Sequence, residues 1–246
     1  INVVRDALKK GTPPDKIGFV SFSRKSVEEA RTRVATELNL TEEDTPWFRT
    51  LHSTGFQWLG FNKDQVMSKY DFNNIGNEVG LVFDTNTARN SQDGLINMSA
   101  REGNKYLEVI HRSIMRCVSL EEQFNETEDY TLHWTLLNKL NAVYHNFKKE
   151  NDKVDFTDMI KGFVRGGSSP SLDLLIVDEA QDLTPLQWRQ VDVMKHNAKE
   201  IWYAGDDDQC IHRWNGVSVE DFINSCHNIE VLKQSYRVPT SVFSVA

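Results

Sequence analysis

The chain has 246 residues, of which 39% are hydrophobic and 26% charged, and its formal net charge is −8. These values are typical of a globular protein with one large α/β domain or two smaller ones, and no apolar run approaches membrane-spanning length. The three cysteines show no metal-ligand spacing, which favours a reducing, intracellular environment. Because the chain is acidic overall, any nucleic-acid surface must be a local patch.

The first 40 residues predict half of a βαβ unit. Apolar side chains of residues 1–10 share one helical face, and residues 17–22, ending in Phe22, have the composition of a short buried strand. A polar turn with Arg24 and Lys25 then leads into a second helix, whose N-terminus presents free N–H groups to an anion. Taken alone, this turn is equally consistent with a solvated charged surface.

Residues 47–53 predict another strand that runs into a helix at Ser53, with Thr50 and His52 at the end of the strand. A single histidine is more often a core or surface residue than a functional one. From about residue 60 to 150, polar loops separate two stretches with the period of packed helices, and this segment is interpreted as a mostly helical insertion without catalytic residues.

The most informative stretch is the apolar run 174–177, which predicts a fully buried strand, followed at once by Asp178 and Glu179. Ligands of open α/β sheets bind outside the carboxyl ends of the strands. One carboxylate there can hold Mg²⁺ through its water shell, and its neighbour can orient or deprotonate a water. The alternative is an acidic turn after a core strand. The whole pattern favours a nucleoside-triphosphatase.

Two further strands are predicted after it. Residues 201–204 lead into glycine, acids and Gln209, whose amide can bond a phosphate oxygen or the attacking water. His212 and Trp214 beside an arginine suggest a stacking platform for single-stranded bases, although a core tryptophan is the alternative. Residues 229–232 predict a last strand, beyond which Arg237 could neutralise charge on a γ-phosphoryl group.

Six segments, in order, resemble the motifs of superfamily 1 DNA helicases of the UvrD/Rep/PcrA type. They are FVSFSRKS (19–26), RTLHS (49–53), DFTDMI (155–160), LLIVDEAQD (174–182), AGDDDQCIHRW (204–214) and QSYR (234–237). The resemblance implies an α/β fold, a RecA-like parallel sheet of the P-loop NTPase type with helices on both faces. Residues 1–59 and 151–246 would form motor domain 1A, and residues 60–150 an inserted, mostly helical 1B-like subdomain.

By the same resemblance, the parent protein is a 3′→5′ ATP-driven translocase on single-stranded DNA that acts in replication or repair. Asp178 would hold Mg²⁺, Glu179 would be the general base, and Gln209 and Arg237 would contact the γ-phosphate of ATP. The expected DNA contacts are Phe22, Arg24, Lys25, Thr50, His52, His212 and Trp214. Expected partners are single-stranded DNA, single/double-strand junctions and a second motor domain. The fragment itself is expected to be monomeric, cytoplasmic and free of membranes.

The sequence departs from the family pattern in several places. The Gly-rich loop that ends in GK[ST] is absent from these 246 residues, as are the later motifs of the second motor domain. Cys210, His212 and Asn215 stand where the family has serine, tyrosine and a basic residue. Two other functions therefore stay open: a DNA- or protein-binding module without hydrolysis, and the helicase part of a helicase–nuclease.

Overall fold

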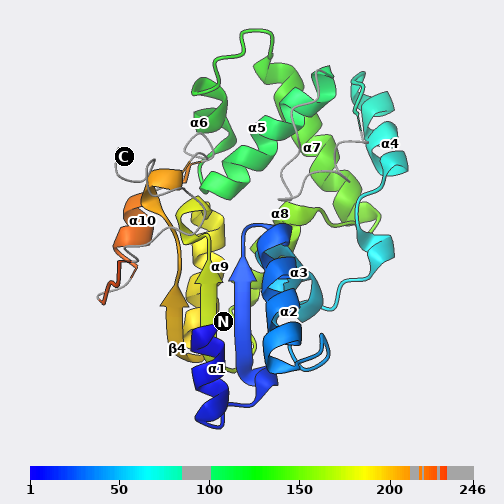
Figure 1. Cartoon of the computed structure of the whole chain (residues 1–246). Helices are drawn as coiled ribbons and strands as arrows, with labels where there is room; N and C mark the ends of the chain where they lie inside the picture. The colour runs from blue at the N-terminus through cyan, green and yellow to red at the C-terminus, as the bar shows by residue number, and fades with distance from the viewer. Residues whose placement is uncertain (85–100, 211–215, 218, 226–227, 232–246) are drawn as a thin grey trace.

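Figure 1 shows the fold as a computed structural model, which describes residues 1–84, 101–210, 216–217, 219–225 and 228–231. Its centre is a parallel sheet of four strands in the order β2-β1-β3-β4. The strands are β1 (Ile17–Ser21), β2 (Phe48–Thr50), β3 (Leu172–Asp178) and β4 (Ala198–Tyr203). The predicted α/β class with a parallel sheet is confirmed.

The register brings the carboxyl ends of three strands to one level. Ser21 at the end of β1 pairs with Thr50 of β2 on one side and with Asp178 of β3 on the other. Val177 of β3 pairs with Tyr203, the last residue of β4. Residues that follow these strands therefore emerge at a common edge of the sheet.

Helices cover both faces of the sheet because the strand side chains alternate. Leu174 and Ile176 of β3 pack with α1 (Asn2–Lys9) and α2 (Arg24–Leu38). Leu175 and Val177 face the opposite way. That face is covered by α3 (Leu51–Trp58), α8 (Phe156–Gly166) and α9 (Pro185–His196).

A second group of helices has its own hydrophobic core beyond the carboxyl ends of the strands (Figure 1). It consists of α4 (Lys69–Val79), α5 (Glu102–Arg116), α6 (Leu120–Asn125) and α7 (Trp134–Glu150), called the helical lobe below. Tyr106, Leu140 and Tyr144 are fully buried in this core. No helix in the described part of the chain is long and apolar enough to cross a membrane.

The described part of the chain also contains several short elements. They are the 3₁₀ turns Pro14–Lys16, Lys63–Gln65, Ala180–Asp182 and Asp207–Gln209, and the short helix α10 (Val219–Ile223).

The helical lobe meets the sheet-bearing part through a buried ionic cluster. Lys148 of α7 donates to Asp155 at 2.6 Å and to Asp158 at 2.7 Å, and the hydroxyl of Tyr144 donates to Asp155 at 2.6 Å. His111 of α5 approaches Asp155 to 3.6 Å. Because Asp155 and Asp158 also form the capping box of α8, this cluster fixes α7 and α5 against the start of α8.

The last predicted strand is wrong over its described part. Residues 229–231 are not a strand, and Ile229 and Val231 are 67% and 73% exposed; residue 232 lies outside the described residues. A strand requires a hydrogen-bonded neighbour, and no strand of the described residues pairs with residues 229–231. The fourth place in the sheet is taken by β2, which is shorter than expected because α3 begins at Leu51.

Candidate functional site at the carboxyl ends of the strands

Two adjacent carboxylates stand at the carboxyl end of β3, an interior strand of the sheet. Asp178 is the last residue of β3, between β1 and β4, and Glu179 follows it with φ 53° and ψ 40°. This left-handed conformation is uncommon for a residue other than glycine, and it typically costs about 1–3 kcal/mol unless the surrounding structure enforces it. Residues with such strained backbones cluster at functional sites, which makes Glu179 a candidate catalytic group.

Hydrogen bonds hold the turn after Glu179. The N–H of Ala180 donates to the carbonyl of Ala204 at 3.0 Å, and the N–H of Ala204 donates to Val177 at 2.8 Å. The side chain of Gln181 is 1% exposed, and its amide donates to the Glu179 carboxylate at 2.9 Å. The turn is therefore tied to the end of β4.

Gln209 lies in the turn that follows β4. Its amide nitrogen donates to the carboxylate of Asp206, and its backbone N–H donates to the Asp206 carbonyl at 3.2 Å. Both side chains are exposed. The structure thus places Asp178, Glu179 and Gln209 after adjacent strands at one edge of the sheet, as the sequence predicts for strand ends.

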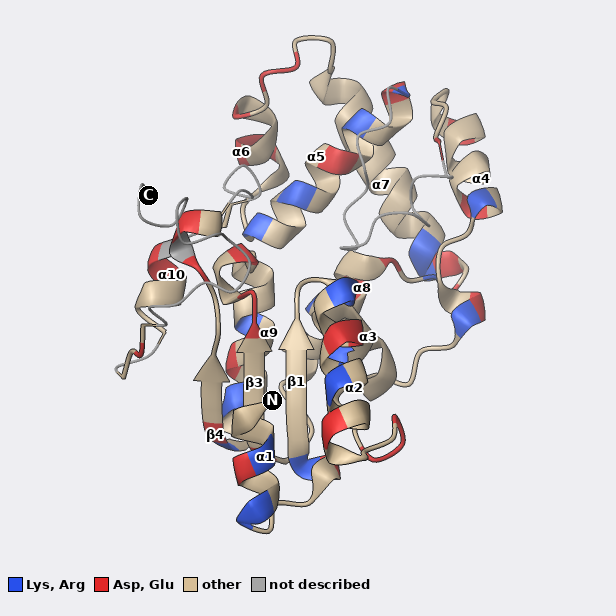
Figure 2. Cartoon of the chain, viewed as in Figure 1, with Lys and Arg blue, Asp and Glu red and all other residues tan. Residues whose placement is uncertain are grey.

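The oxygen donors at this edge suit Mg²⁺. This cation keeps several waters and needs only one or two carboxylates besides the phosphates of a nucleotide. Asp178 and Glu179 supply that number. In the described part of the chain no group of three or more histidines, cysteines or acids has metal-binding geometry. Acidic and basic residues are interspersed over both parts of the molecule in the view of Figure 2.

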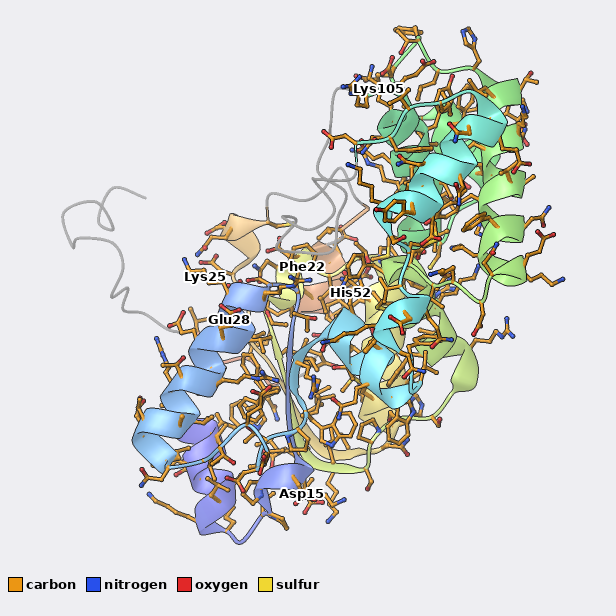
Figure 3. All side chains as sticks on the ribbon, turned by 90° about the vertical axis from the view of Figure 1, so that its right-hand side faces the viewer. Asp15, Phe22, Lys25, Glu28, His52 and Lys105 are labelled. Atoms are coloured by element: carbon orange, nitrogen blue, oxygen red, sulfur yellow. The ribbon has the colours of Figure 1, made fainter. Side chains whose placement is uncertain are left out.

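The turn between β1 and α2 lies at the same edge. Figure 3 shows Phe22, Lys25 and His52 at the end of the sheet-bearing part that lies nearest the helical lobe, and Asp15 at the opposite end of that part. The Ser23 hydroxyl accepts from the N–H of Ser26 at 3.2 Å and so caps α2. Arg24 and Lys25 are exposed, whereas Phe22 is only 5% exposed and belongs to the core.

The end of β2 is more enclosed than expected. Thr50 accepts from the N–H of Ser53 at 3.2 Å and caps α3. His52 is 8% exposed, and its ring lies edge-on to Phe156 with 5.8 Å between centroids. Burial, reinforced by nearby Arg24, lowers the pKa of His52 to about 4, so the ring is neutral at physiological pH.

These positions separate the predicted DNA contacts into three kinds. Arg24 and Lys25 are exposed cations, and Thr50 is half-buried. Phe22 and His52 do not offer a ring to solvent in this conformation, so their role as stacking residues stays a prediction that requires this surface to open. His212, Trp214 and Arg237 lie outside the described residues.

Gln181 is the residue for which the sequence suggested no role. It stands inside the DEAQD segment, where an amide between three acids is itself a signal, because an amide can donate to a carboxylate and at the same time accept from a backbone N–H.

Residues 2–229 match the family described as the UvrD/REP helicase N-terminal domain. The chain belongs to this family. Similar UvrD/REP relatives include the ATP-dependent DNA helicase PcrA of Leuconostoc citreum, which is 23% identical over 95% of this chain and 32% of its own length. The ATP-dependent DNA helicase Rep of Buchnera aphidicola subsp. Schizaphis graminum is 25% identical over 91% of this chain and 35% of its own length.

A further UvrD/REP relative, the ATP-dependent DNA helicase PcrA of Staphylococcus epidermidis, is 22% identical over 97% of this chain and 34% of its own length. The chain therefore spans about a third of the length of the curated relatives it matches.

Proposed function

We propose that this chain is the first motor domain of an ATP-dependent 3′→5′ helicase or translocase on single-stranded DNA. The observation that carries the proposal is the position of Asp178 and Glu179 at the end of the central strand, with Gln209 after the neighbouring strand. The names of the relatives, ATP-dependent DNA helicases, support it. The helical lobe corresponds to the inserted subdomain, residues 60–150.

In this proposal each residue has a separate task. Asp178 holds the cation of the Mg²⁺–ATP complex, which neutralises charge on the phosphates, and Glu179 accepts the proton of the attacking water. Gln209 contacts the γ-phosphate or that water through its amide. Arg237 completes the set, and closure requires a second motor domain.

Single-stranded DNA would cross the same edge of the sheet. Arg24 and Lys25, exposed at the start of α2, are suited to phosphates, and Thr50 lies at the end of the adjacent β2. Stacking is assigned to His212 and Trp214, with junctions between single- and double-stranded DNA as the physiological substrate. A DNA substrate implies an intracellular location.

The test is Glu179→Gln in the longer polypeptide that joins this domain to a phosphate-binding loop and a second motor domain. The amide keeps the shape of the side chain and loses its basicity, so nucleotide affinity should stay within about threefold while turnover falls at least about a hundredfold. Glu200→Gln is the matched control, because Glu200 is an exposed carboxylate of β4 paired with Leu174, in the first half of the strand. Near-normal turnover in Glu179→Gln would remove this residue as the base.

A further inference from the structure

We propose that Gln181 is a positioning residue that couples Glu179 to the turn after β4. The inference rests on the proposed catalytic role of Glu179. Its basis is one buried side chain whose two polar atoms bond to two different segments. The amide nitrogen donates to Glu179 at 2.9 Å and to Asp182 at 3.2 Å. The amide oxygen accepts from the backbone N–H of Asp206 at 3.1 Å.

The chemistry of the neighbours fixes the orientation of this amide. Carboxylates accept hydrogen bonds only, and a backbone N–H donates only. If the amide of Gln181 were turned over, its oxygen would face Glu179 and Asp182 and its NH₂ group would face the N–H of Asp206. Three partner atoms would then lose their bonds in a region where Gln181 is 1% exposed, so a single orientation is enforced.

The backbone of Gln181 is held as well. Its carbonyl accepts from the thiol of Cys210 at 3.4 Å, beyond the turn that carries Gln209. Gln181 thus contacts both ends of the segment 206–210, once through the side chain and once through the backbone. A displacement of this segment would move Gln181 and, through the 2.9 Å bond, the Glu179 carboxylate.

The lack of space around Gly205 is a second observation that supports the same coupling. A Cβ at this position would lie 2.5 Å from the amide oxygen of Gln181 and 2.9 Å from the ring of Phe222. Any side chain at 205 would therefore push the Gln181 amide away from Asp206. The sequence at Gly205 and the side chain of Gln181 are matched to each other.

For catalysis, these bonds connect Gln209, which contacts the γ-phosphate in the proposed site, with Glu179, which acts as the base. In the proposed site Gln209 contacts the γ-phosphate, and it is bonded to Asp206, whose N–H is held by Gln181. Movement of Gln209 toward a bound phosphate is thereby transmitted to the carboxylate that takes the proton from water. Gln181 does not touch the substrate in this scheme. Gln181 orients the Glu179 carboxylate, which acts as the base.

The experiment uses Gln181→Met in the longer polypeptide, because methionine retains length and apolar bulk and removes both hydrogen-bonding atoms. We expect kcat for ATP hydrolysis to fall at least tenfold, the KM for ATP to change less than about threefold, and the acidic limb of the pH–rate profile to move. Gln190→Met is the matched control: Gln190 is also a buried glutamine with one bond, to the carbonyl of Leu51 at 2.9 Å, and lies on α9. Gln190→Met should lower the free energy of unfolding and leave kcat unchanged.

The outcomes separate this inference from the proposed function. If the wild-type polypeptide does not hydrolyse ATP, the function itself is wrong. If Glu179→Gln hydrolyses ATP at a near-normal rate, Glu179 is not the base and the positioning role of Gln181 falls with it. If wild type is active, Glu179→Gln is inactive and Gln181→Met has wild-type kcat and pH profile, only the positioning role is overturned. If Gln181→Met does not fold, Gly205→Ala decides, since it displaces the amide without removing it: a tenfold lower kcat supports the coupling, and an unchanged kcat overturns it.

Discussion

Replacing Lys148 with methionine tests whether the helical lobe is fixed by the ionic cluster it shares with α8. Lys148 is 5% exposed, like its partner Asp155. Its ammonium group donates to Asp155 and Asp158 and lies 4.4 Å from the centre of the Tyr144 ring. Methionine keeps the apolar stem of the side chain and removes the charge, so the substitution isolates the ionic part of the contact.

The expected loss of unfolding free energy follows from the contacts that Asp155 keeps after the substitution. After the substitution the Asp155 carboxylate stays buried and keeps hydrogen bonds from Thr157 and Tyr144, but it has no full positive charge bonded to it. Removing one partner of a buried pair costs about 3–5 kcal/mol. For a chain of this size that corresponds to a fall in melting temperature of roughly 6–20 °C.

The assay is urea unfolding of the 246-residue chain, with Lys149→Met as the control. Lys149 is the next residue of α7 and is exposed, so its loss should cost less than about 1 kcal/mol. The double variant Lys148→Met, Asp155→Asn should recover part of the loss, because it removes the stranded charge. Equal, small effects of Lys148→Met and Lys149→Met would refute the reasoning.

The pH dependence gives a second check of the same cluster. Burial alone would raise the pKa of Asp155. The opposing effects of Lys148 and then His111 are together larger, so the pKa of Asp155 lies well below its ordinary value of 3.8. The stabilisation from this carboxylate is present above pH 3.8 and is lost as the pH falls through the folded-state pKa. Without Lys148 the pKa of Asp155 rises, so the stability difference between wild type and variant should narrow in acid. A constant difference would contradict the assignment.

Three further predictions concern other parts of the chain. Because the pKa of His52 falls from 6.5 to about 4 on folding, stability should be full above pH 6.5 and should decline by about 3 kcal/mol as the pH falls to 4; a His52→Asn variant whose urea unfolding shows an equally steep decline would exclude His52 as its source. Gly55→Ala should destabilise the chain by about 1–3 kcal/mol, because the new Cβ would lie 2.4 Å from the carbonyl oxygen of Met159, whereas Gly166→Ala, with nothing within 4 Å, should be neutral or stabilising by up to about 1 kcal/mol. Thermal unfolding that ranks these two variants in the opposite order would contradict the packing of α3 on α8. The isolated 246 residues should hydrolyse ATP negligibly, since they contain no GK[ST] loop to cradle the phosphates; robust DNA-stimulated phosphate release by this chain alone would be incompatible with that expectation.

The sheet could be predicted where a strand has a strong local signal. The apolar run ending at Asp178 is buried on both faces in the structure, as its composition indicates. Residues 229–232 have a similar composition, and the prediction failed there over the described residues 229–231. Composition reports how well a segment suits a strand. It does not report whether a neighbouring strand is available to pair with it.

Exposure at the candidate site depended on contacts between distant segments. Phe22 and His52 stand at strand ends, as expected, but whether a ring faces DNA or the core is decided by what packs over it, and Phe156 covers His52 from more than 100 positions away. Lys148 precedes Lys149 in a run that suggests a solvated helix end. Its burial becomes evident only when α8 is placed beside α7.

The measurement that tests the central claim most directly is the rate of ATP hydrolysis by the longer polypeptide, with and without single-stranded DNA, for wild type and Glu179→Gln. We predict that DNA stimulates hydrolysis by the wild type and that Glu179→Gln abolishes it, while both proteins bind nucleotide and DNA with similar affinity. Binding of single-stranded DNA by the wild type without any hydrolysis of ATP would contradict the motor and identify a binding module instead.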